Sequence, residues 1–233
     1  PRLGGRLRLA AVPPHKARYG EACDYLEREI RKLGVDIHLN AAVTEVELDS
    51  RKPDAVILAT GSVPFVPPIQ GLSGGGAVLV DDVLEGRAPV GRRVAIIGGG
   101  AIGAETAHLL VEEEDREVYL IEMRDGIAVD LPQDARICLL HAFEQTPSLH
   151  QITNAKVTAV TPESITLERQ GQTEVVDRLD TIILAVGARP NQGLRPALEA
   201  LGIPFLVSGD ATGPKDYVKA IYEGFVAGNT IAE

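Results

Sequence analysis

A glycine-rich turn between an apolar strand and a helix constrains the fold of this chain more than any other feature. The strand is predicted at Arg92–Ile97, and the turn follows as Gly98-Gly99-Gly100-Ala101-Ile102-Gly103. In the pattern G-x-G-x-x-G, the first glycine permits the tight turn, the second lets a pyrophosphate approach the backbone, and the third lets helix and strand pack closely. The sequence therefore predicts a βαβ unit, extending from Val94 to Glu122, that binds a dinucleotide at the start of its helix.

An acidic residue stands where such a unit needs one. The second strand, Glu117–Ile121, is followed by Glu122. A carboxylate at this place accepts hydrogen bonds from an adenosine ribose and repels a 2′-phosphate, so NAD(H) is favoured over NADP(H). Arg124 could reach a 2′-phosphate if Glu122 turned away, and we assign it to the same site. A glycine-rich turn used only for close packing is the alternative interpretation.

The helix after the turn contributes two further candidates. Ile102 is assigned to the cofactor site, and together with Thr106, Leu109 and Leu110 it is expected to form the apolar face of the helix. Glu105 either complements the positive end of the helix dipole or faces the nicotinamide end of a bound cofactor.

Helix and strand patterns alternate along the rest of the chain, which predicts an α/β fold. Helices are expected over residues 15–33 and Tyr217–Ile231, and a linker rich in proline and glycine over 64–76. Further strands are expected at Val35–Leu39, Ala55–Ala59, Lys156–Thr161, Ser164–Arg169, Thr181–Val186 and Phe205–Val207.

Two segments of the chain repeat. Asp54–Gly61 and Asp180–Gly187 share the pattern D-x-[VI]-I-L-A-x-G, and Val43–Val46 matches Val157–Val160 as V-T-x-V. The common order indicates a duplication in which each half has a V-T-x-V strand followed by a buried strand that ends in glycine. Equal spacing from the turn at Gly98 places a first glycine fingerprint upstream of residue 1, so we expect the chain to begin just after a βαβ unit.

Composition excludes several classes of protein. The 233 residues have a formal net charge of −10, which argues against nucleic-acid binding because phosphate contacts need clustered Lys and Arg. No apolar run reaches the roughly 18 residues that a membrane span needs. The two cysteines, Cys23 and Cys138, form neither a disulfide framework nor a metal site; we expect both to pack inside helices of a cytoplasmic protein.

The sequence resembles the C-terminal FAD/NAD(P)-binding region of the 2,4-dienoyl-CoA reductase and trimethylamine dehydrogenase family, in which an old-yellow-enzyme-like barrel precedes two glutathione-reductase-like domains. The resemblance rests on Leu3–Arg6, Ala59-Thr60-Gly61, Pro67–Gly71, Gly98–Glu105, Val186–Asn191 and Gly209-Asp210. It implies two three-layer (ββα) dinucleotide-binding domains, the first lacking its N-terminal βαβ unit. Their expected bounds are 1–88 plus 204–233 for the incomplete FAD-type domain and 89–203 for the NAD(P)-binding, Rossmann-like domain.

The resemblance also implies roles for individual residues. Gly98, Gly100 and Gly103 would hold the NAD pyrophosphate, Glu122 the adenosine ribose, and Glu105 would lie near the nicotinamide. Gly187 would line the nucleotide cleft. On the flavin side, Thr60 and Gly61 would border FAD, Val43 would contact its adenine through the backbone, and Asp210 would bind its ribityl or pyrophosphate region.

The sequence departs from the family pattern in four ways. The first G-x-G-x-x-G, the flavin barrel and the cysteines of its iron–sulfur cluster are absent, as is the dithiol of disulfide reductases. No residue is therefore assigned a catalytic or metal-binding role, and FAD binding by this chain is expected to be weak or absent. The expected partners are the barrel and iron–sulfur region of a parent protein, or a second copy paired through exposed strand edges.

Three functions remain open at this point. The first is the part of a flavin-dependent oxidoreductase that binds NAD(P)H and passes its hydride to FAD. The second is a non-catalytic module that binds ADP or NAD, which we expect for the chain in isolation. The third is a ferredoxin-reductase-like enzyme, which needs an intact first fingerprint.

Overall fold

The computed structural model describes residues 2–72, 75–112, 116–214 and 216–231. The chain divides into two compact units: unit 1 comprises Pro1–Leu7, Glu21–Pro64 and Ala188–Glu233, and unit 2 comprises Arg8–Gly20 and Phe65–Gly187. Both differ from the boundaries expected from the sequence, since 8–20 and 65–88 lie in unit 2 and 188–203 lies in unit 1. Residue 1 and residues 73–74 of the expected linker lie outside the described residues.

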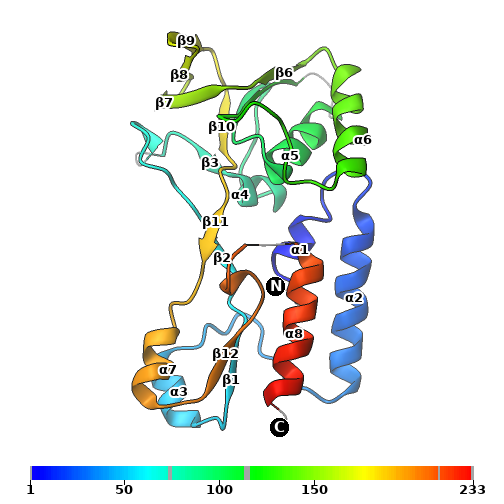
Figure 1. Cartoon of the computed structure of the whole chain (residues 1–233), viewed down its shortest axis with the longest axis vertical. Helices are drawn as coiled ribbons and strands as arrows, with labels where there is room; N and C mark the ends of the chain where they lie inside the picture. Colours follow the sequence, from blue (N-terminus) through cyan, green and yellow to red (C-terminus); the bar gives the residue numbers. More distant parts are fainter. Residues whose placement is uncertain (1, 73–74, 113–115, 215, 232–233) are drawn as a thin grey trace. The chain divides into compact units, whose positions relative to one another are not determined.

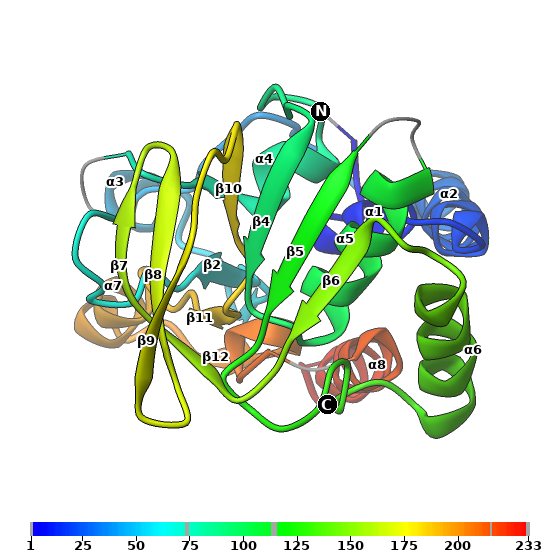
Figure 2. The same ribbon diagram turned by 90° about the horizontal axis from the view of Figure 1, so that it is seen from above.

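A five-stranded parallel sheet forms the middle of unit 2. Its strand order is β3 (Val78–Leu79), β10 (Thr181–Leu184), β4 (Arg93–Ile97), β5 (Glu117–Ile121) and β6 (Leu149–Ile152); Figure 2 shows β4, β5 and β6 side by side. The edge strand β3 continues directly into α4 (Val80–Leu84), whose Val80 and Leu84 are buried. This pairing explains why the segment before residue 89 belongs to unit 2.

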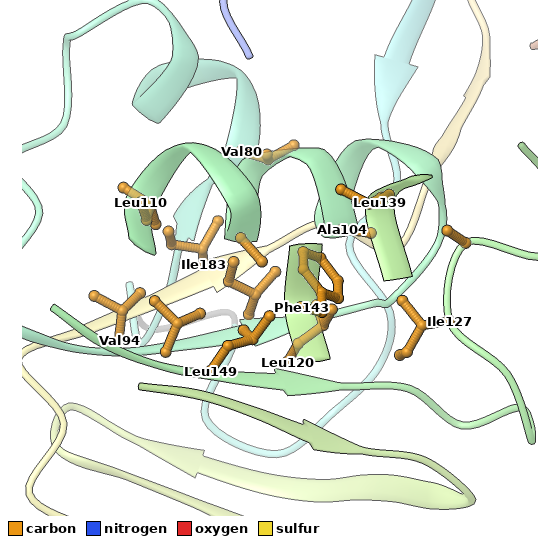
Figure 3. Close-up of a cluster of buried hydrophobic side chains, with 14 of the residues drawn as sticks. Val80, Val94, Ala104, Leu110, Leu120, Ile127, Leu139, Phe143, Leu149 and Ile183 are labelled. Carbon is orange, nitrogen blue, oxygen red and sulfur yellow. The ribbon is translucent and has the colours of Figure 1, made fainter. Parts of the chain in front are cut away.

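Helices cover one face of this sheet. Helix α5 (Ala101–Glu112) packs on β4 and β5, and it also contacts α4 and α6 (Gln133–Glu144). Figure 3 shows the side chains of this core, including Val94, Leu120 and Ile183 from the sheet and Leu110 from α5. Strand β4 is buried from Val94 to Ile97, as expected for a central parallel strand that is covered on both faces.

A second sheet covers the other face. It consists of β7 (Ala155–Thr161), β8 (Ser164–Arg169) and β9 (Gln172–Val176), joined as an antiparallel meander. Ile165 and Leu167 of β8 are fully buried and pack in one cluster with Ala95 and Ile97 of β4. Unit 2 therefore has the three-layer ββα architecture expected from the sequence, and the α/β fold class is confirmed.

Unit 1 contains two short two-stranded sheets and several helices. β1 (Val56–Leu58) pairs parallel with β12 (Phe205–Val207), and β2 (Ser62–Pro64) pairs antiparallel with β11 (Ala188–Pro190). α3 (Glu45–Arg51) contacts α7 (Arg195–Leu201), and α8 (Tyr217–Ile231) contacts the 3₁₀ helix η2 (Gly209–Ala211). Along the chain, the assignment changes from unit 1 to unit 2 within α1 (Arg6–Leu9) and back to unit 1 within α2 (Ala17–Lys32); both helices are labelled in Figure 1.

Two strands predicted in unit 1 are wrong. Val35–Leu39 has no regular structure. Val43–Val46 is not a strand either, because Thr44 caps α3: its hydroxyl accepts the Glu47 N–H at 3.3 Å, and the Glu47 carboxylate accepts the Thr44 N–H at 2.9 Å. This capping box satisfies amide donors that a helix start leaves open, so the segment forms a helix where the repeat suggested a strand.

The repeated segments Asp54–Gly61 and Asp180–Gly187 have the same kind of backbone turn at their ends. The strand of each copy leads to a glycine in the left-handed region, Gly61 at φ 69° and Gly187 at φ 97°. In unit 1, the tripeptides that directly follow these glycines, β2 and β11, pair with each other in register from Ser62↔Pro190 to Pro64↔Ala188. This symmetric pairing agrees with a duplication.

The cysteines differ from each other in their surroundings. Cys23 is buried as expected, whereas Cys138 is exposed on α6, because Leu139 and Phe143 form the buried face of that helix. The expectation that both cysteines pack inside is therefore wrong for Cys138. In the ranges that the structure describes, no helix is long and apolar enough to traverse a lipid bilayer.

A cluster of polar side chains lies at the N-terminal ends of the parallel strands. The Tyr119 hydroxyl donates to Glu117 Oε1 at 2.7 Å and accepts from Arg93 at 2.6 Å, and the His150 ring stacks on Tyr119 with centroids 4.6 Å apart. The hydrogen bond from Tyr119, opposed by burial and reinforced by His150 and Arg93, lowers the pKa of Glu117. Burial, followed by the hydrogen bond to Glu117, raises the pKa of Tyr119 to about 12.

We expect Tyr119→Phe to lower the free energy of unfolding by about 1 kcal/mol near neutral pH, because Glu117 and Arg93 both lose a partner. The Glu117 pKa is lowered from 4.5, so its contribution is present above pH 4.5 and disappears as the pH falls further. The Tyr119 pKa is raised from 10.0, so its contribution is present below pH 10.0 and disappears as the pH rises towards 12. Urea denaturation at a series of pH values should therefore give the largest difference in unfolding free energy between the wild type and Tyr119→Phe between pH 4.5 and pH 10.0.

The matched control is Tyr25→Phe, since Tyr25 is 55% exposed on α2. Its effect should stay within about 0.5 kcal/mol. A Tyr119→Phe difference that is independent of pH would contradict the assigned role of the cluster.

Candidate nucleotide-binding site

The turn between β4 and α5 has a backbone that requires glycine at its first position. Gly98 has φ 107°, and its N–H donates to the Ile121 carbonyl at 2.8 Å. A Cβ at Gly98 would lie 2.4 Å from the Ala185 carbonyl oxygen, a backbone atom. The chain can thus pass from strand to helix here only without a side chain.

The third glycine permits the close approach of helix and strand. A Cβ at Gly103 would lie 1.9 Å from the carbonyl oxygen of Gly98 and 3.3 Å from the Cβ of Ala185. Because the nearest of these neighbours is a backbone atom of the turn, only glycine at this position lets the start of α5 lie against the end of β4.

The two middle glycines differ in what surrounds them. A Cβ at Gly99 would meet Ile127 Cδ1 at 2.6 Å and Glu122 Cβ at 2.8 Å, so crowding requires glycine at this variable position of the pattern. A Cβ at Gly100 would meet only the ends of two flexible side chains, Asp130 at 3.2 Å and Arg124 at 3.7 Å. The surroundings of Gly100, at the N-terminus of α5, can therefore open by rotation of these two side chains.

Glu122 is buried beside this turn. Its Oε2 accepts the Gly99 N–H at 2.7 Å, and its Oε1 accepts the backbone N–H of Arg124 at 2.8 Å and the Arg124 Nε–H at 3.2 Å. Burial raises the pKa of the carboxyl, but the two backbone hydrogen bonds and the Arg124 side chain outweigh it and leave the pKa of Glu122 below its ordinary value. An ionised carboxylate has about four acceptor positions, so Oε2 can accept a further hydroxyl.

Arg124 lies on the solvent side of Glu122. Its side chain is 47% exposed and hydrogen-bonds through Nε to the carboxylate. We expected Arg124 to reach a 2′-phosphate only if Glu122 pointed away from the glycine-rich turn. In the structure, Glu122 points towards this turn.

Two residues of α5 lie differently from what the pattern suggested. Ile102 is 40% exposed at the start of the helix, so it is not part of the buried face; Ala104, Thr106, Ala107 and Leu110 are. Glu105 lies beyond the first turn and is 8% exposed, paired with Lys16. Of the two roles expected for Glu105, the interaction with the positive end of the helix dipole is therefore not found; Glu105 forms an ion pair with Lys16 instead.

The remaining predicted residue of unit 2 is Gly187, which follows the carboxyl end of β10. Its carbonyl accepts the Phe65 N–H at 3.0 Å, and a Cβ there would meet nothing within 4 Å. The structure thus brings the fingerprint glycines, Ile102, Glu122 and Arg124 together at the carboxyl edge of β4 and β5, where open α/β sheets bind ligands.

The residues predicted to contact FAD lie in unit 1. Thr60 donates through its hydroxyl to the Asn191 carbonyl, and the Gly61 carbonyl accepts the Asn191 N–H at 2.9 Å. Asp210 accepts from the Ser62 hydroxyl at 3.2 Å. Val43 is 50% exposed and directly precedes the cap of α3.

Sequence reasoning missed two residues of the site. Lys16 is 89 positions before Glu105, and Asp130, whose Oδ1 accepts the Ala101 N–H at 2.9 Å, follows the second strand in a loop without periodicity. Neither residue belongs to a local pattern, so the sequence offers no signal that would have found them.

Comparisons with known proteins match almost the whole chain. A family model described as pyridine nucleotide-disulphide oxidoreductase matches residues 49–213. A bilirubin reductase of Mediterraneibacter gnavus is 36% identical over 98% of this chain and 35% of its own length, and an NADH oxidase of Thermoanaerobacter brockii is 32% identical over 96% and 35%. The chain thus spans about a third of the length of these relatives.

A solved structure shows the same fold. A 2-naphthoyl-CoA reductase in complex with 2-naphthoyl-CoA superimposes with a TM-score of 0.90 at 25% identity, over 97% of this chain and 34% of that chain. A histamine dehydrogenase from Rhizobium sp. superimposes with a TM-score of 0.78 over 95% of this chain at 16% identity, which supports the fold alone.

Proposed function

Because the chain belongs to the pyridine nucleotide-disulphide oxidoreductase family, we propose that unit 2 binds NAD(H) with its pyrophosphate over Gly100. The single observation that carries this proposal is the position of Glu122, whose carboxylate accepts the Gly99 N–H at 2.7 Å. An adenosine ribose bound to Glu122 would have its pyrophosphate at the N-terminus of α5, where the amide groups and the helix dipole favour an anion.

The preference for NAD(H) over NADP(H) is also part of the proposal. Support comes from the lowered pKa of Glu122, which keeps the carboxylate ionised at neutral pH, where it repels a 2′-phosphate. Arg124 hydrogen-bonds to this carboxylate and so partly neutralises it.

The activity that we propose is electron transfer within a larger flavin-dependent oxidoreductase of the 2,4-dienoyl-CoA reductase and trimethylamine dehydrogenase group. When bound, the nicotinamide supplies a hydride to a flavin. The residues of this chain hold the dinucleotide: Glu122 the ribose, the turn the pyrophosphate, and Glu105, charge-balanced by Lys16, the region near the nicotinamide. This proposal is supported by the relatives, which match nearly the whole chain but are about three times as long, as expected if the chain is one part of a larger enzyme.

For the chain by itself we propose weak or absent FAD binding, since its 233 residues contain one glycine fingerprint. In the described part of unit 1, β1 and β12 pair only with each other, and we propose that such an open sheet pairs with the parent protein or a second copy. Flavin absorbance and sedimentation equilibrium of the purified chain test these two proposals. We also propose a reducing, cytoplasmic location, because two cysteines in 233 residues are too few for the disulfide framework of a secreted domain.

Glu122→Gln tests the assignment of the dinucleotide. We expect the affinity for NADH to fall about tenfold, because the amide is a weaker acceptor for the ribose hydroxyls. The affinity for NADPH should rise, because the repulsion of the 2′-phosphate is lost. Calorimetric titration of the wild type and the variant with NADH and with NADPH measures the ratio of the two affinities.

The matched control is Glu174→Gln, which removes the same charge from an exposed position on β9. It should leave both affinities unchanged. An NADPH/NADH ratio that is the same in Glu122→Gln and the wild type would contradict the role of Glu122, and a chain that binds neither dinucleotide would contradict the proposed function.

A further inference from the structure

A carboxylate of the chain lies where the ligand's pyrophosphate is expected. Oδ1 of Asp130 accepts the Ala101 N–H at 2.9 Å, at the first residue of α5. Oδ2 of the same carboxylate is 3.2 Å from the point where a Cβ of Gly100 would stand. An anionic group of the protein therefore borders the space at Gly100 and already accepts the first amide of α5.

The loop that carries Asp130 is fixed against the turn. Ile127 is 3% exposed and packs in the core between the helices and the sheet. The Ala128 N–H donates to the Gly99 carbonyl at 2.7 Å, and Arg136 Nε donates to the Ile127 carbonyl at 2.8 Å. Ala128 has a left-handed backbone with φ 52°. Asp130 follows Ala128 by two positions, so these anchors place it over the turn.

A carboxylate and a phosphate bind to a helix N-terminus for the same reasons. Each accepts hydrogen bonds from amide groups of the first turn, which have no partner within the helix, and each is attracted by the positive end of the dipole. Two anions in contact with the same amide repel each other, and the repulsion is strong where solvent is partly excluded.

We propose that Asp130 is an internal anion that occupies the pyrophosphate position on α5 and must leave Ala101 when a dinucleotide binds. The proposal rests on the proposed function of the same site. The residue as a whole is exposed, so its side chain can rotate into solvent while Ile127 and Ala128 stay anchored. Asp130 then sets the affinity for the diphosphate portion of the ligand without touching the adenosine or the nicotinamide.

The test is a calorimetric titration of the full chain and its Asp130→Ala and Asp130→Asn variants with NADH, ADP and adenosine. Asp130→Ala removes both the occupant and its charge, and we expect the affinities for NADH and ADP to rise about tenfold at low salt. Asp130→Asn removes the charge but keeps an acceptor for Ala101, so its gain should be smaller. The affinity for adenosine, which has no phosphate, should not change.

The matched control is Asp125→Asn, which removes the same charge from an exposed position in the same loop and should leave all three affinities at the wild-type level. Hydrogen exchange of the Ala101 amide gives a second measurement: Asp130→Ala should speed its exchange in the ligand-free chain and not in the NADH complex. Wild-type binding of NADH with no gain in Asp130→Ala would overturn this inference alone. Absence of NADH binding in the wild type and both variants would overturn the proposed function as well.

Discussion

Gly103→Ala is expected to lower the free energy of unfolding of unit 2 by more than about 3 kcal/mol. The added Cβ would lie 1.9 Å from the Gly98 carbonyl oxygen and 3.1 Å from its carbonyl carbon. Both are backbone atoms of the turn, so the conflict can be relieved only if α5 moves away from β4. The cores on both faces of β4, at Val94 and Ile97, would then lose contacts. Urea denaturation, followed by circular dichroism, measures the loss.

Gly224→Ala is the matched control, since it makes the same change in α8, where a Cβ would meet nothing within 4 Å. Alanine is favoured over glycine in a helix, so this variant should be neutral or more stable by up to about 1 kcal/mol. Equal stabilities of Gly103→Ala and the wild type would contradict the close contact between α5 and β4.

Gly100→Val is expected to keep the fold but to weaken NADH binding about a hundredfold or more. A Cβ at Gly100 meets only the ends of the Asp130 and Arg124 side chains, which can rotate into solvent. The branched side chain would then fill the space in which the pyrophosphate approaches the backbone. Calorimetric titration with NADH gives the affinity, and the thermal unfolding midpoint shows whether the variant is folded.

Gly193→Val provides the comparison for this change. Gly193 is exposed in unit 1, and its nearest neighbour would be the Asn191 side chain at 3.6 Å. The control should bind NADH as the wild type does. A folded Gly100→Val that binds NADH with wild-type affinity would show that the pyrophosphate does not lie over Gly100.

The part of the site that the sequence could predict is the part with local rules. The turn that begins at Gly98 and the acid at Glu122 follow from fixed spacing within one βαβ unit. In the structure, a hydrogen bond from the Gly99 N–H to the Glu122 carboxylate joins the two. Lys16 and Asp130 reach the site only through tertiary packing, which no spacing along the chain encodes.

The errors in secondary structure have a similar origin. The repeat at Val43–Val46 predicts a strand, but Thr44 and Glu47 have the spacing of a capping box and start a helix instead. The assignment of residues 65–88 to unit 2 does not follow from the sequence pattern, because β3 has only two residues, too few for the alternation by which a strand is recognised.

The central claim is that a dinucleotide lies with its pyrophosphate on the first turn of α5. The most direct test is a titration of the ¹⁵N-labelled wild-type chain with NADH, followed through the backbone amide resonances. We predict saturable shifts that are largest from Gly99 to Gly103, with smaller shifts at Glu122 and Arg124. Saturable binding whose largest shifts lie outside this turn, or no binding at all, would contradict the claim.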